Sequence, residues 1–352
     1  MKGESSLSGL KPRGVRFVLT SLLLMVTCAP IEGAFGIQVA LGVQKQHNAD
    51  FQRHVNSHLS TDANGSKWSR PDPVDSGVDL TSISCSTKDF CAVLEGANFA
   101  HIFNGRSWTP PQPIDVGTLV SVSCPTSDFC MAVDAAGFFL TYSKRSWSIP
   151  FQRSYFDPSH ALITSVSCAS QSFCVATDAA GNVFVYNGKS WTTPQSLAHT
   201  ASLNSVSCPT SSFCARVDDH DAYLYSDRKW SAPVVVNSGR QLTAVACASQ
   251  SFCAAVDGGG NVFAFNGRTW TSANRISKVR LDSISCPSPS FCVTVNESGQ
   301  AVAFNGKTWS MATTIDQTQY LTSISCPSIS FCAVVDARGN VIFRDEVASR
   351  VG

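Results

Sequence analysis

The chain carries little charge, and the two signs nearly cancel. Asp, Glu, Lys and Arg together make up 14% of its 352 residues, and the formal net charge is +1. Proteins that bind DNA or RNA concentrate positive charge to neutralise phosphates, and this composition supplies no such basic field. We therefore expect no nucleic-acid partner.

The sequence also lacks an uninterrupted apolar stretch long enough for a membrane helix, which needs about 20 residues. The apolar run 17–26 is followed by Pro30 and Glu32 before apolar residues resume. Basic residues precede this run, and small residues suited to cleavage come after it. We expect a signal peptide over residues 1–34 and no transmembrane span in the mature chain. The alternative is a retained membrane helix, since apolar residues resume from Ala34 to Val43, although Pro30, Glu32 and several glycines interrupt the span.

The segment around the predicted cleavage site leaves alternatives open. Cys28 lies inside the leader, where it is either lost on processing or becomes a lipidated N-terminal cysteine. Residues 35–60 show no apolar periodicity and are predicted to form a flexible lead-in.

Cysteine, by contrast, is abundant and regularly placed. Fourteen of the fifteen cysteines form seven pairs six positions apart, and successive pairs begin 39 to 44 residues apart. Such a density predicts export to an oxidising compartment. A pair without a nearby histidine or second pair cannot supply four zinc ligands, so each pair is expected to form a disulfide between neighbouring strands. The expected bonds join Cys85 to Cys91, Cys124 to Cys130, Cys168 to Cys174, Cys208 to Cys214, Cys247 to Cys253, Cys286 to Cys292 and Cys326 to Cys332.

The repeated unit around each pair predicts four short strands. In the last unit, three alternating segments with turn residues between them lie within residues 321–343. A fourth strand follows a turn such as Asn305-Gly306, whose residues accept positive φ. A period near 40 with four strands is typical of a β-propeller. The sequence therefore predicts an all-β, seven-bladed β-propeller over residues 61–347, with four antiparallel strands per blade and a tail over residues 348–352.

The seven tryptophans, one for each unit, predict how the ring closes. Trp68 precedes the first cysteine pair, and no tryptophan follows the last pair. Residues 64–72 are therefore expected to supply the fourth strand of the C-terminal blade. This closure removes two exposed sheet edges.

Other recurrent aromatic residues are predicted to form the core, because blades pack face to face and bury both sides of each sheet. One set precedes the second cysteine and another precedes the third-strand turn. They are Phe90, Phe129, Phe173, Phe213, Phe252, Phe291 and Phe331, and Phe103, Tyr142, Tyr186, Tyr225, Phe265, Phe304 and Phe343.

Acidic residues recur at the turns between the second and third strands, and basic residues recur at the turns between the third and fourth strands. The topology places these two kinds of turn on opposite faces of the disc. The charged residues either cap and solvate these turns or form a polarised disc that orients on a charged partner. The acidic set is Glu95, Asp134, Asp178, Asp218, Asp257, Glu297 and Asp336; the basic set is Lys67, Arg106, Arg145, Lys189, Lys229, Arg268 and Lys307.

The connectors between blades vary most, and a rigid scaffold that presents variable loops is typical of recognition. The connector after Trp147 is about five residues longer than the others and supplies the candidate ligand-binding residues Arg153, Tyr155, Asp157 and His160. The alternative is that this connector is a plain surface loop with no role in binding.

A second candidate ligand-binding pair is Asp219 and His220, which replace the usual glycine in a turn of the fourth unit. Metal binding there is one reading of the turn, but the alternative is a solvated turn, and the sequence predicts no metal site or cofactor. Serines of the first strand have no recurring histidine and acid beside them, so no catalytic residue is predicted.

The unit Ser-Val-Ser-Cys-Pro-Thr-Ser-Ser-Phe-Cys at 205–214 resembles the repeat of largely uncharacterised secreted β-propellers of bacteria, notably actinobacteria. A more distant likeness is to the Asp-box repeat of sialidases, which Gly306, Thr308 and Trp309 match, although Phe304 stands where the box has Asp. The resemblance implies the propeller fold and an extracytoplasmic location, and it implies no particular activity.

The sequence thus favours a secreted or cell-surface binding module, expected to be a monomer, that recognises an extracellular glycan or protein through the face bearing the long connectors. Two alternatives stay open. One is an extracellular hydrolase or lyase on the propeller scaffold, and the other is a structural component of the cell envelope.

Overall fold

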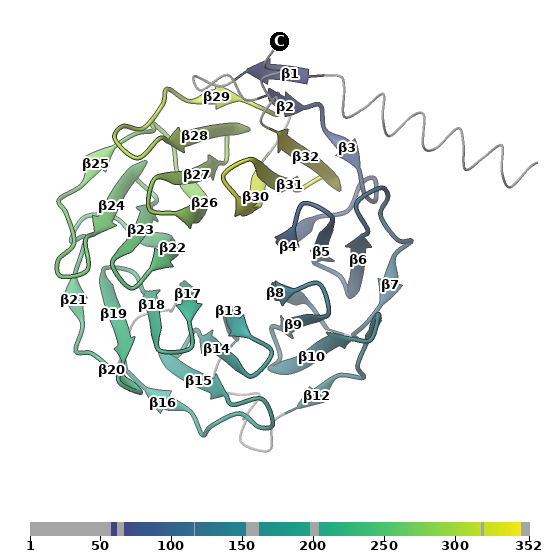
Figure 1. Ribbon diagram of the computed structural model, residues 1–352, viewed down its shortest axis with the longest axis horizontal. Coiled ribbons are helices and arrows are strands. Elements are labelled where there is room, and N and C mark those ends of the chain that lie inside the picture. The colour runs from purple at the N-terminus through teal and green to yellow at the C-terminus, as the bar shows by residue number, and fades with distance from the viewer. Residues whose placement is uncertain are drawn as a thin grey trace, which may run out of the picture. The chain divides into compact units, whose positions relative to one another are not determined.

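The computed structural model describes residues 58–61, 67–115, 117–152, 162–197, 204–317 and 320–345. These residues form seven antiparallel sheets arranged as blades around a central axis (Figure 1). We number the blades 1 to 7 from the one that contains Cys85. The predicted all-β fold of seven four-stranded blades is confirmed.

Each blade begins with the strand closest to the axis and continues outwards (Figure 1). The innermost strands of blades 1 to 7 are β4 (Leu80–Thr87), β8 (Leu119–Thr126), β13 (Ile163–Ser170), β17 (Ser205–Thr210), β22 (Leu242–Ser249), β26 (Leu281–Ser288) and β30 (Leu321–Ser328). The second strands are β5 (Phe90–Glu95), β9 (Phe129–Asp134), β14 (Phe173–Asp178), β18 (Phe213–Val217), β23 (Phe252–Asp257), β27 (Phe291–Asn296) and β31 (Phe331–Asp336). The third strands are β6 (Phe99–Phe103), β10 (Phe138–Ser143), β15 (Asn182–Tyr186), β19 (Asp221–Ser226), β24 (Asn261–Phe265), β28 (Gln300–Phe304) and β32 (Asn340–Asp345).

The outermost strand of each blade is interrupted. It makes contact at the tryptophan, then leaves the sheet, and rejoins it for two residues: β7 (Gln112–Pro113), β12 (Phe151–Gln152), β16 (Gln195–Ser196), β21 (Val234–Val235), β25 (Asn274–Arg275) and β29 (Thr313–Thr314). The tryptophan contact is itself a strand in blades 2 and 4, β11 (Ser146–Trp147) and β20 (Lys229–Trp230), and a single bridge in blades 1, 3, 5 and 6.

A hydroxyl residue after each tryptophan accounts for this interruption. In blade 1, Thr109 Oγ1 accepts a hydrogen bond from the Ile102 amide at 3.0 Å, while the Thr109 amide donates to the Ile102 carbonyl at 2.9 Å. The Thr109 hydroxyl thus takes the place of a backbone carbonyl as acceptor. The amide of the third strand keeps a hydrogen bond although the outer strand turns away. The same Trp-Ser or Trp-Thr pair occurs in every blade, at Trp68, Trp108, Trp147, Trp191, Trp230, Trp270 and Trp309.

Ring closure by the N-terminal segment is confirmed. β2 (Lys67–Ser69) and β3 (Asp72–Pro73) both pair with β32 and complete blade 7. Trp68 is only 1% exposed, so it is among the most deeply buried large side chains of the core. The sheet also starts earlier than predicted, because β1 (His58–Thr61) pairs with β2 and includes residues that we assigned to the lead-in.

All seven predicted disulfides are present, each within one blade, and their Cα–Cα distances are 3.9 to 4.1 Å. In blade 1, Cys85 on β4 lies directly opposite Cys91 on β5, next to a bulge in the pairing. The cysteine spacing therefore reflects the length of the turn that joins the first two strands. From blade 1 to blade 7, the bonds join Cys85 to Cys91, Cys124 to Cys130, Cys168 to Cys174, Cys208 to Cys214, Cys247 to Cys253, Cys286 to Cys292 and Cys326 to Cys332.

The second cysteine of each pair lies deeper than the first. Cys91, on the second strand of blade 1, is 0% exposed, whereas Cys85 on the innermost strand is 7% exposed. The same holds in the other six blades, because the second strand is covered on both faces by neighbouring blades. The fully buried partners there are Cys130, Cys174, Cys214, Cys253, Cys292 and Cys332.

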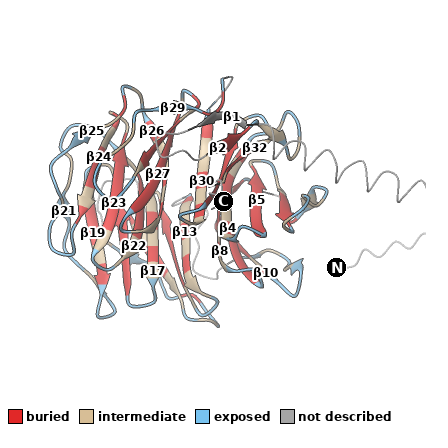
Figure 2. Cartoon of the chain, turned by 45° about the horizontal axis from the view of Figure 1, so that its top comes forward, coloured by how far each residue is buried: buried red, intermediate tan, exposed pale blue. Residues whose placement is uncertain are grey.

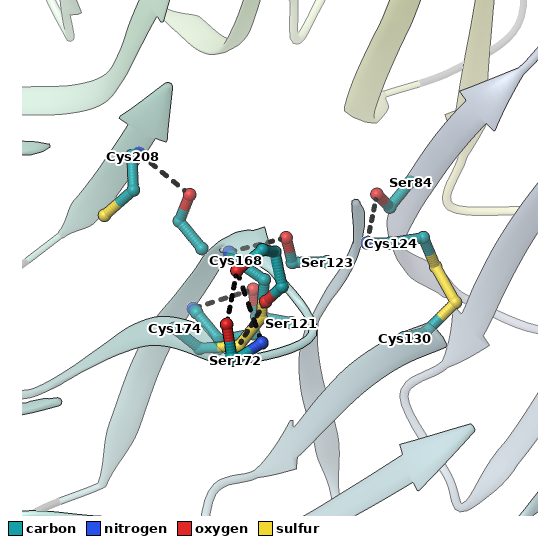
Figure 3. The surroundings of a disulfide bond; sticks show 12 residues. Ser84, Ser121, Ser123, Cys124, Cys130, Cys168, Ser172, Cys174 and Cys208 are labelled. Atoms are coloured by element: carbon teal, nitrogen blue, oxygen red, sulfur yellow. Dashed lines mark hydrogen bonds between the residues drawn. A yellow bond between two sulfur atoms is a disulfide. The ribbon is translucent and has the colours of Figure 1, made fainter. Parts of the chain in front are cut away.

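The innermost strands are linked to each other by serine side chains (Figure 3). Ser84 Oγ in blade 1 accepts a hydrogen bond from the Cys124 amide in blade 2 at 2.9 Å. Equivalent serines serve six of the seven junctions, including the closing one, where Ser325 Oγ accepts from the Cys85 amide at 2.9 Å. Blade 5 has Ala244 and Ala246 at these positions. The serines therefore connect neighbouring blades, in addition to being small enough for the crowded axis.

The second strand of each blade is buried at nearly every position, on both faces (Figure 2). Aromatic residues at the predicted positions meet between blades, as when Phe90 of blade 1 lies 5.8 Å from Tyr142 of blade 2. Adjacent sheets thus bury each other, which is why the predicted core residues carry so little polarity.

Blade 7 buries the predicted Phe343 and adds an arginine to the core. The strand register places Arg344, not Phe343, opposite Cys332 and Trp68. Arg344 is 1% exposed, and its guanidinium lies 4.7 Å from the ring centroid of Phe291 in blade 6. A cation–π contact therefore replaces the aromatic pair found at other junctions.

Blade 4 also buries an arginine. Arg216 is fully buried, its guanidinium lies 3.6 Å from the Tyr223 ring centroid, and none of its nitrogens has a hydrogen-bond acceptor among the described residues. Burial lowers the pKa of Arg216 to about 10. Cation–π contacts with the rings of Tyr223 and Trp230 stabilise this buried charge.

Candidate functional site

Turns between second and third strands lie beside the connectors that enter each blade, and we call this side the connector face. The Ala135 amide donates to the Thr118 carbonyl at 2.8 Å, and the Gly258 amide donates to the Gln241 carbonyl at 2.9 Å. The turns that contain the disulfides and the Asn-Gly hairpins lie on the opposite side, as the strand order requires.

Six of the seven acidic residues predicted for this face are buried instead of forming a charged surface, and Glu297 is half-buried. Asp178 is 2% exposed, and its Oδ1 accepts hydrogen bonds from the Ala180 and Asn182 amides of the following turn. The strand register assigns this position in blade 6 to Asn296, not Glu297. The turn-capping interpretation is therefore correct, and the polarised disc is wrong for the acidic set, since a carboxylate that caps a turn from inside is not presented to a partner.

An axial cavity of about 450 Å³ opens on the connector face, where the innermost strands begin. Its lining combines apolar, amide and cationic side chains from blades 2 to 6. Leu162 is 61% exposed, so this apolar side chain is available for contact. The lining includes Val120, Leu162, Thr164, Asn204, Gln241 and Arg280.

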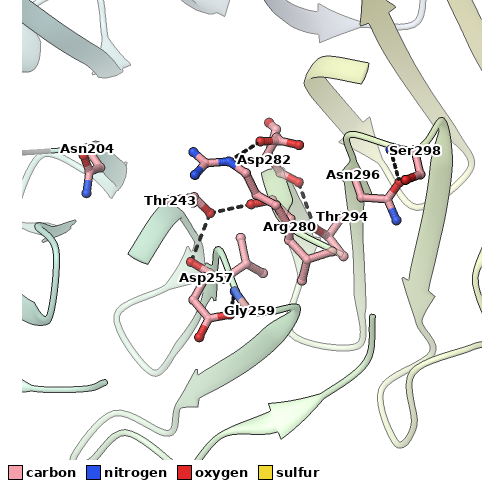
Figure 4. A network of polar contacts seen from close by, with 12 residues as sticks. Asn204, Thr243, Asp257, Gly259, Arg280, Asp282, Thr294, Asn296 and Ser298 are labelled. Carbon is pink, nitrogen blue, oxygen red and sulfur yellow. Dashed lines mark hydrogen bonds and ion pairs between the residues drawn. The ribbon is translucent and has the colours of Figure 1, made fainter. Parts of the chain in front are cut away.

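Polar contacts between neighbouring blades give the cavity a fixed rim. Asn204 Nδ2 donates to the Leu242 carbonyl at 2.7 Å, and Gln241 Nε2 donates to Asp219 Oδ1 at 2.7 Å. Thr243 Oγ1 donates to the Leu281 carbonyl at 2.6 Å, which repeats the same link one blade further on (Figure 4). These contacts hold the amide side chains in defined positions before any ligand arrives.

Arg280 supplies the positive charge of the cavity (Figure 4). Its Nε donates to Asp282 Oδ1 at 2.7 Å, and its side chain is 45% exposed. Within the described ranges, no residue accepts a hydrogen bond from its two terminal nitrogens. Burial raises the pKa of Asp282, whereas the hydrogen bond from Arg280 opposes that rise. The Nε of the guanidinium is thus bound to Asp282, and its two terminal NH₂ groups can donate hydrogen bonds to an anionic group.

The structure separates the sequence-predicted site residues. Asp219 is half-buried and contributes to the rim of the axial cavity through Gln241. The His220 side chain is exposed, and its amide donates to Asp218 Oδ1 as part of the turn. Arg280 was missed because it follows Val279 in a connector of ordinary length, where nothing in the repeat marks it.

The long connector after Trp147 carries the other predicted ligand-binding residues. Arg153, Tyr155, Asp157 and His160 lie outside the described residues, and their role in ligand binding stays a prediction. The described chain resumes at Leu162, which lines the axial cavity.

A second hollow lies on the outer side between blades 5 and 6, with a volume of about 1290 Å³. Arg275, Lys278 and Lys307 contribute positive charge, and Trp309 and Met311 contribute apolar surface. Met311 is 88% exposed. The groove is wide and open, and the sequence repeat gave no indication of it.

The described chain is thus a seven-bladed, disulfide-linked β-propeller with an axial cavity on its connector face. A structure titled YCF48 bound to D1 peptide matches 83% of this chain and 98% of its own, with 13% identity and a TM-score of 0.64. YCF48 from Cyanidioschyzon merolae matches 78% of this chain and 98% of its own, with 14% identity and a TM-score of 0.61. The WD40 β-propeller domain of Doa1 matches 79% of this chain and 96% of its own, with 12% identity and a TM-score of 0.65.

These likenesses establish the fold and nothing finer, because the identities are low. No protein-family model and no curated protein sequence matches the chain. Among the described residues, no helix is long and apolar enough to cross a membrane.

Proposed function

We propose that this protein is an exported binding module that recognises a segment of another protein through the axial cavity. The observation that carries the proposal is the arrangement around Arg280. A half-exposed guanidinium with two terminal donors lies in one cavity with fixed amide groups and the exposed apolar side chain of Leu162. A peptide offers the matching features, which are a carboxylate, backbone amides and an apolar side chain.

Two further points support a protein partner. One of the structurally similar propellers, YCF48, has been solved with a bound peptide, so this scaffold is able to present a peptide site. The serines of the innermost strands, which could otherwise suggest nucleophilic catalysis, accept backbone hydrogen bonds from the neighbouring blade. A serine held in this way serves the ring, and a binding role suits the cavity better than hydrolysis.

The proposal places the protein outside the cytoplasm. Seven disulfides require oxidising conditions to form and persist. The predicted signal peptide over residues 1–34 and the resemblance to secreted bacterial propellers support export. A glycan partner, which the sequence left open, becomes one outcome of the test below.

Peptide display followed by a charge-removing substitution tests the proposal. The oxidised protein is panned against a library of random 12-residue peptides, and enriched peptides are measured by fluorescence anisotropy. We expect enrichment of peptides with an acidic residue next to an apolar one. Arg280→Gln should weaken their binding by at least tenfold, because charge-assisted hydrogen bonds contribute about 1.5–3 kcal/mol each. Gln keeps a donor that can reach Asp282, so the fold should be retained.

Arg268→Gln is the matched control, because Arg268 is exposed on the opposite side of the disc. It should change the affinity by less than twofold. Enriched peptides that bind the Arg280→Gln variant as tightly as the wild type would refute the axial site. Binding confined to a glycan array, with no enriched peptide, would refute the protein partner.

A further inference from the structure

Blade 1 differs from the other blades at two positions that face each other. At the end of its second strand it has Glu95, where the strand register gives Asp or Asn in the other blades. At the centre of its third strand it has His101, where the other blades have apolar or aromatic residues. Those residues are Leu140, Phe184, Tyr223, Phe263, Val302 and Ile342. The six other blades serve as an internal comparison, and they show that neither replacement is needed for the fold.

The two replacements form one buried pair. His101 Nε2 lies 2.6 Å from Glu95 Oε1, and their side chains are 0% and 4% exposed. His101 Nδ1 lies 3.1 Å from the Thr109 carbonyl oxygen, which can only accept a hydrogen bond. Nδ1 therefore carries a proton, and Nε2 is directed at the carboxylate with one proton shared between them.

Asp75 adds a second carboxylate to this pair. One potential ligand atom from each of Asp75, Glu95 and His101 lies within 4.8 Å of the others. Asp75 is half-buried, whereas the other two residues are buried, so solvent reaches the cluster from the Asp75 side. Asp75 belongs to the closing segment, which connects the outer edge of blade 7 to blade 1.

The backbone around Asp75 is fixed by a close approach to blade 7. The amides of Val74 and Asp75 donate to the Gly339 carbonyl at 2.8 and 3.2 Å, and the Gly77 amide donates to the Arg338 carbonyl at 2.9 Å. Gly339 has a φ of +90°, and a Cβ built there would overlap the Asp75 carbonyl oxygen. Only glycine permits this approach, which holds the Asp75 carboxylate beside blade 1.

We propose that Asp75, Glu95 and His101 form a binding site for a divalent transition-metal ion of the Zn²⁺ type. Imidazole and carboxylate are the ligands that such ions use, and a ligating histidine commonly donates its other N–H to a backbone carbonyl, as His101 does to Thr109. Water from the half-exposed side fills the remaining position.

A metal ion at this place would join the closing segment to blade 1. A divalent cation also offsets the repulsion between two carboxylates that lie close together in a largely buried site. The ion therefore supports the ring at its closing junction, which is a role separate from ligand recognition at the axial cavity.

The next junction provides a matched comparison. Asp115 of the connector and Asp134 of blade 2 occupy positions equivalent to those of Asp75 and Glu95, and both are buried. The apolar Leu140 stands where blade 1 has His101. This carboxyl pair has no imidazole, so it should not retain Zn²⁺ at micromolar concentration.

Calorimetric titration of the untagged, oxidised full chain with ZnCl₂, after removal of metal with a chelator, tests the proposal. We expect one ion per chain with a dissociation constant in the micromolar range or below, and a higher melting temperature with Zn²⁺.

Asp75→Asn decides the outcome, because Asp75 is half-exposed and its replacement preserves the side-chain shape. It should weaken Zn²⁺ binding at least tenfold and remove the rise in melting temperature, and His101→Gln should abolish binding. Asp115→Asn should change the affinity by less than twofold. No binding at 1 mM Zn²⁺, or equal binding by the Asp75→Asn variant, would overturn the proposal even if the His101→Gln variant did not fold.

Discussion

Replacing Asp134 by Asn should stabilise the protein near neutral pH, although it alters a buried residue of a second strand. Asp134 is 1% exposed and lies beside Asp115, which is 7% exposed. Burial is the main cause that raises the pKa of Asp134 to about 6, and the charge of Asp115 adds to it, while the hydrogen bond from the Phe138 amide opposes the rise. A side-chain hydrogen bond to Asp115, which protonated Asp134 can donate, also raises this pKa.

The direction of the pH dependence follows from this pKa. The folded state holds a proton on Asp134 up to about pH 6, whereas the unfolded chain loses it near 3.8. Between these values the folded protein binds more protons than the unfolded one, so the free energy of unfolding falls as the pH rises and levels off above about pH 6. A rise of roughly two pKa units corresponds to about 3 kcal/mol as an upper bound.

The asparagine side chain removes the charge and keeps the contacts. Its Oδ1 can still accept from the Phe138 amide, which lies 2.6 Å from Asp134 Oδ1, and its NH₂ group can donate to Asp115. The protein already uses this arrangement at another junction, where Asn237 Nδ2 donates to Asp257 Oδ2 at 2.7 Å. We expect Asp134→Asn to raise the free energy of unfolding by about 1–2 kcal/mol at pH 7.5.

Urea denaturation of the oxidised protein at pH 4, 5, 6 and 7.5 measures both effects. The wild type should lose stability between pH 4 and 6, and the gain from Asp134→Asn should shrink towards zero at pH 4. Asp128→Asn, a change at an exposed acid in the same blade, should have no comparable effect. A variant destabilised equally at pH 4 and 7.5 would show that Asp134 is held ionised by contacts that we have underestimated.

Two further predictions concern the closure and the serine contacts. Trp68→Ala should lower the free energy of unfolding by about 3–5 kcal/mol in urea denaturation, because Trp68 is fully buried. Trp108→Ala, at a half-buried tryptophan, should cost less. A Trp68→Ala protein as stable as the wild type would argue against closure by the N-terminal segment. Ser84→Ala should lower the free energy of unfolding by about 1 kcal/mol. Ala246→Ser should raise it by a similar amount, because the new hydroxyl gives the Cys286 amide an acceptor. A destabilised Ala246→Ser protein would mean that the fifth junction has no room for the hydroxyl group.

The architecture could be predicted from the sequence because the same pattern of strands, turns and cysteines occurs in seven successive units. Constant spacing within the cysteine pairs predicted disulfides inside each blade, and the phase of Trp68 predicted which segment closes the ring. Local chemistry decides both features: the turn length sets which cysteines meet, and a buried tryptophan needs a sheet to cover it. One error came from matching residue type without knowing the strand register, when Glu297 was chosen over Asn296. Phe343 is buried as predicted, although Arg344 occupies the position opposite Cys332.

The candidate site was predicted less well. The connector face was proposed from the variable loops, and Asp219 does lie on the rim of its axial cavity. Arg280 gave no signal in the sequence, because its place in the cavity lining depends on how blades 2 to 6 meet around the axis.

What the sequence determined by itself is the repeating blade, since its strands, turns and disulfides depend on residues within about 40 positions of each other. Tertiary structure decided what happens between blades. The serine hydroxyls became acceptors for the neighbouring blade's amides, and Asp75 came to lie beside Glu95 and His101. These groups interact because the ring closes and holds one blade against the next, and hydrogen bonds and ligand geometry depend on that distance and not on spacing along the chain.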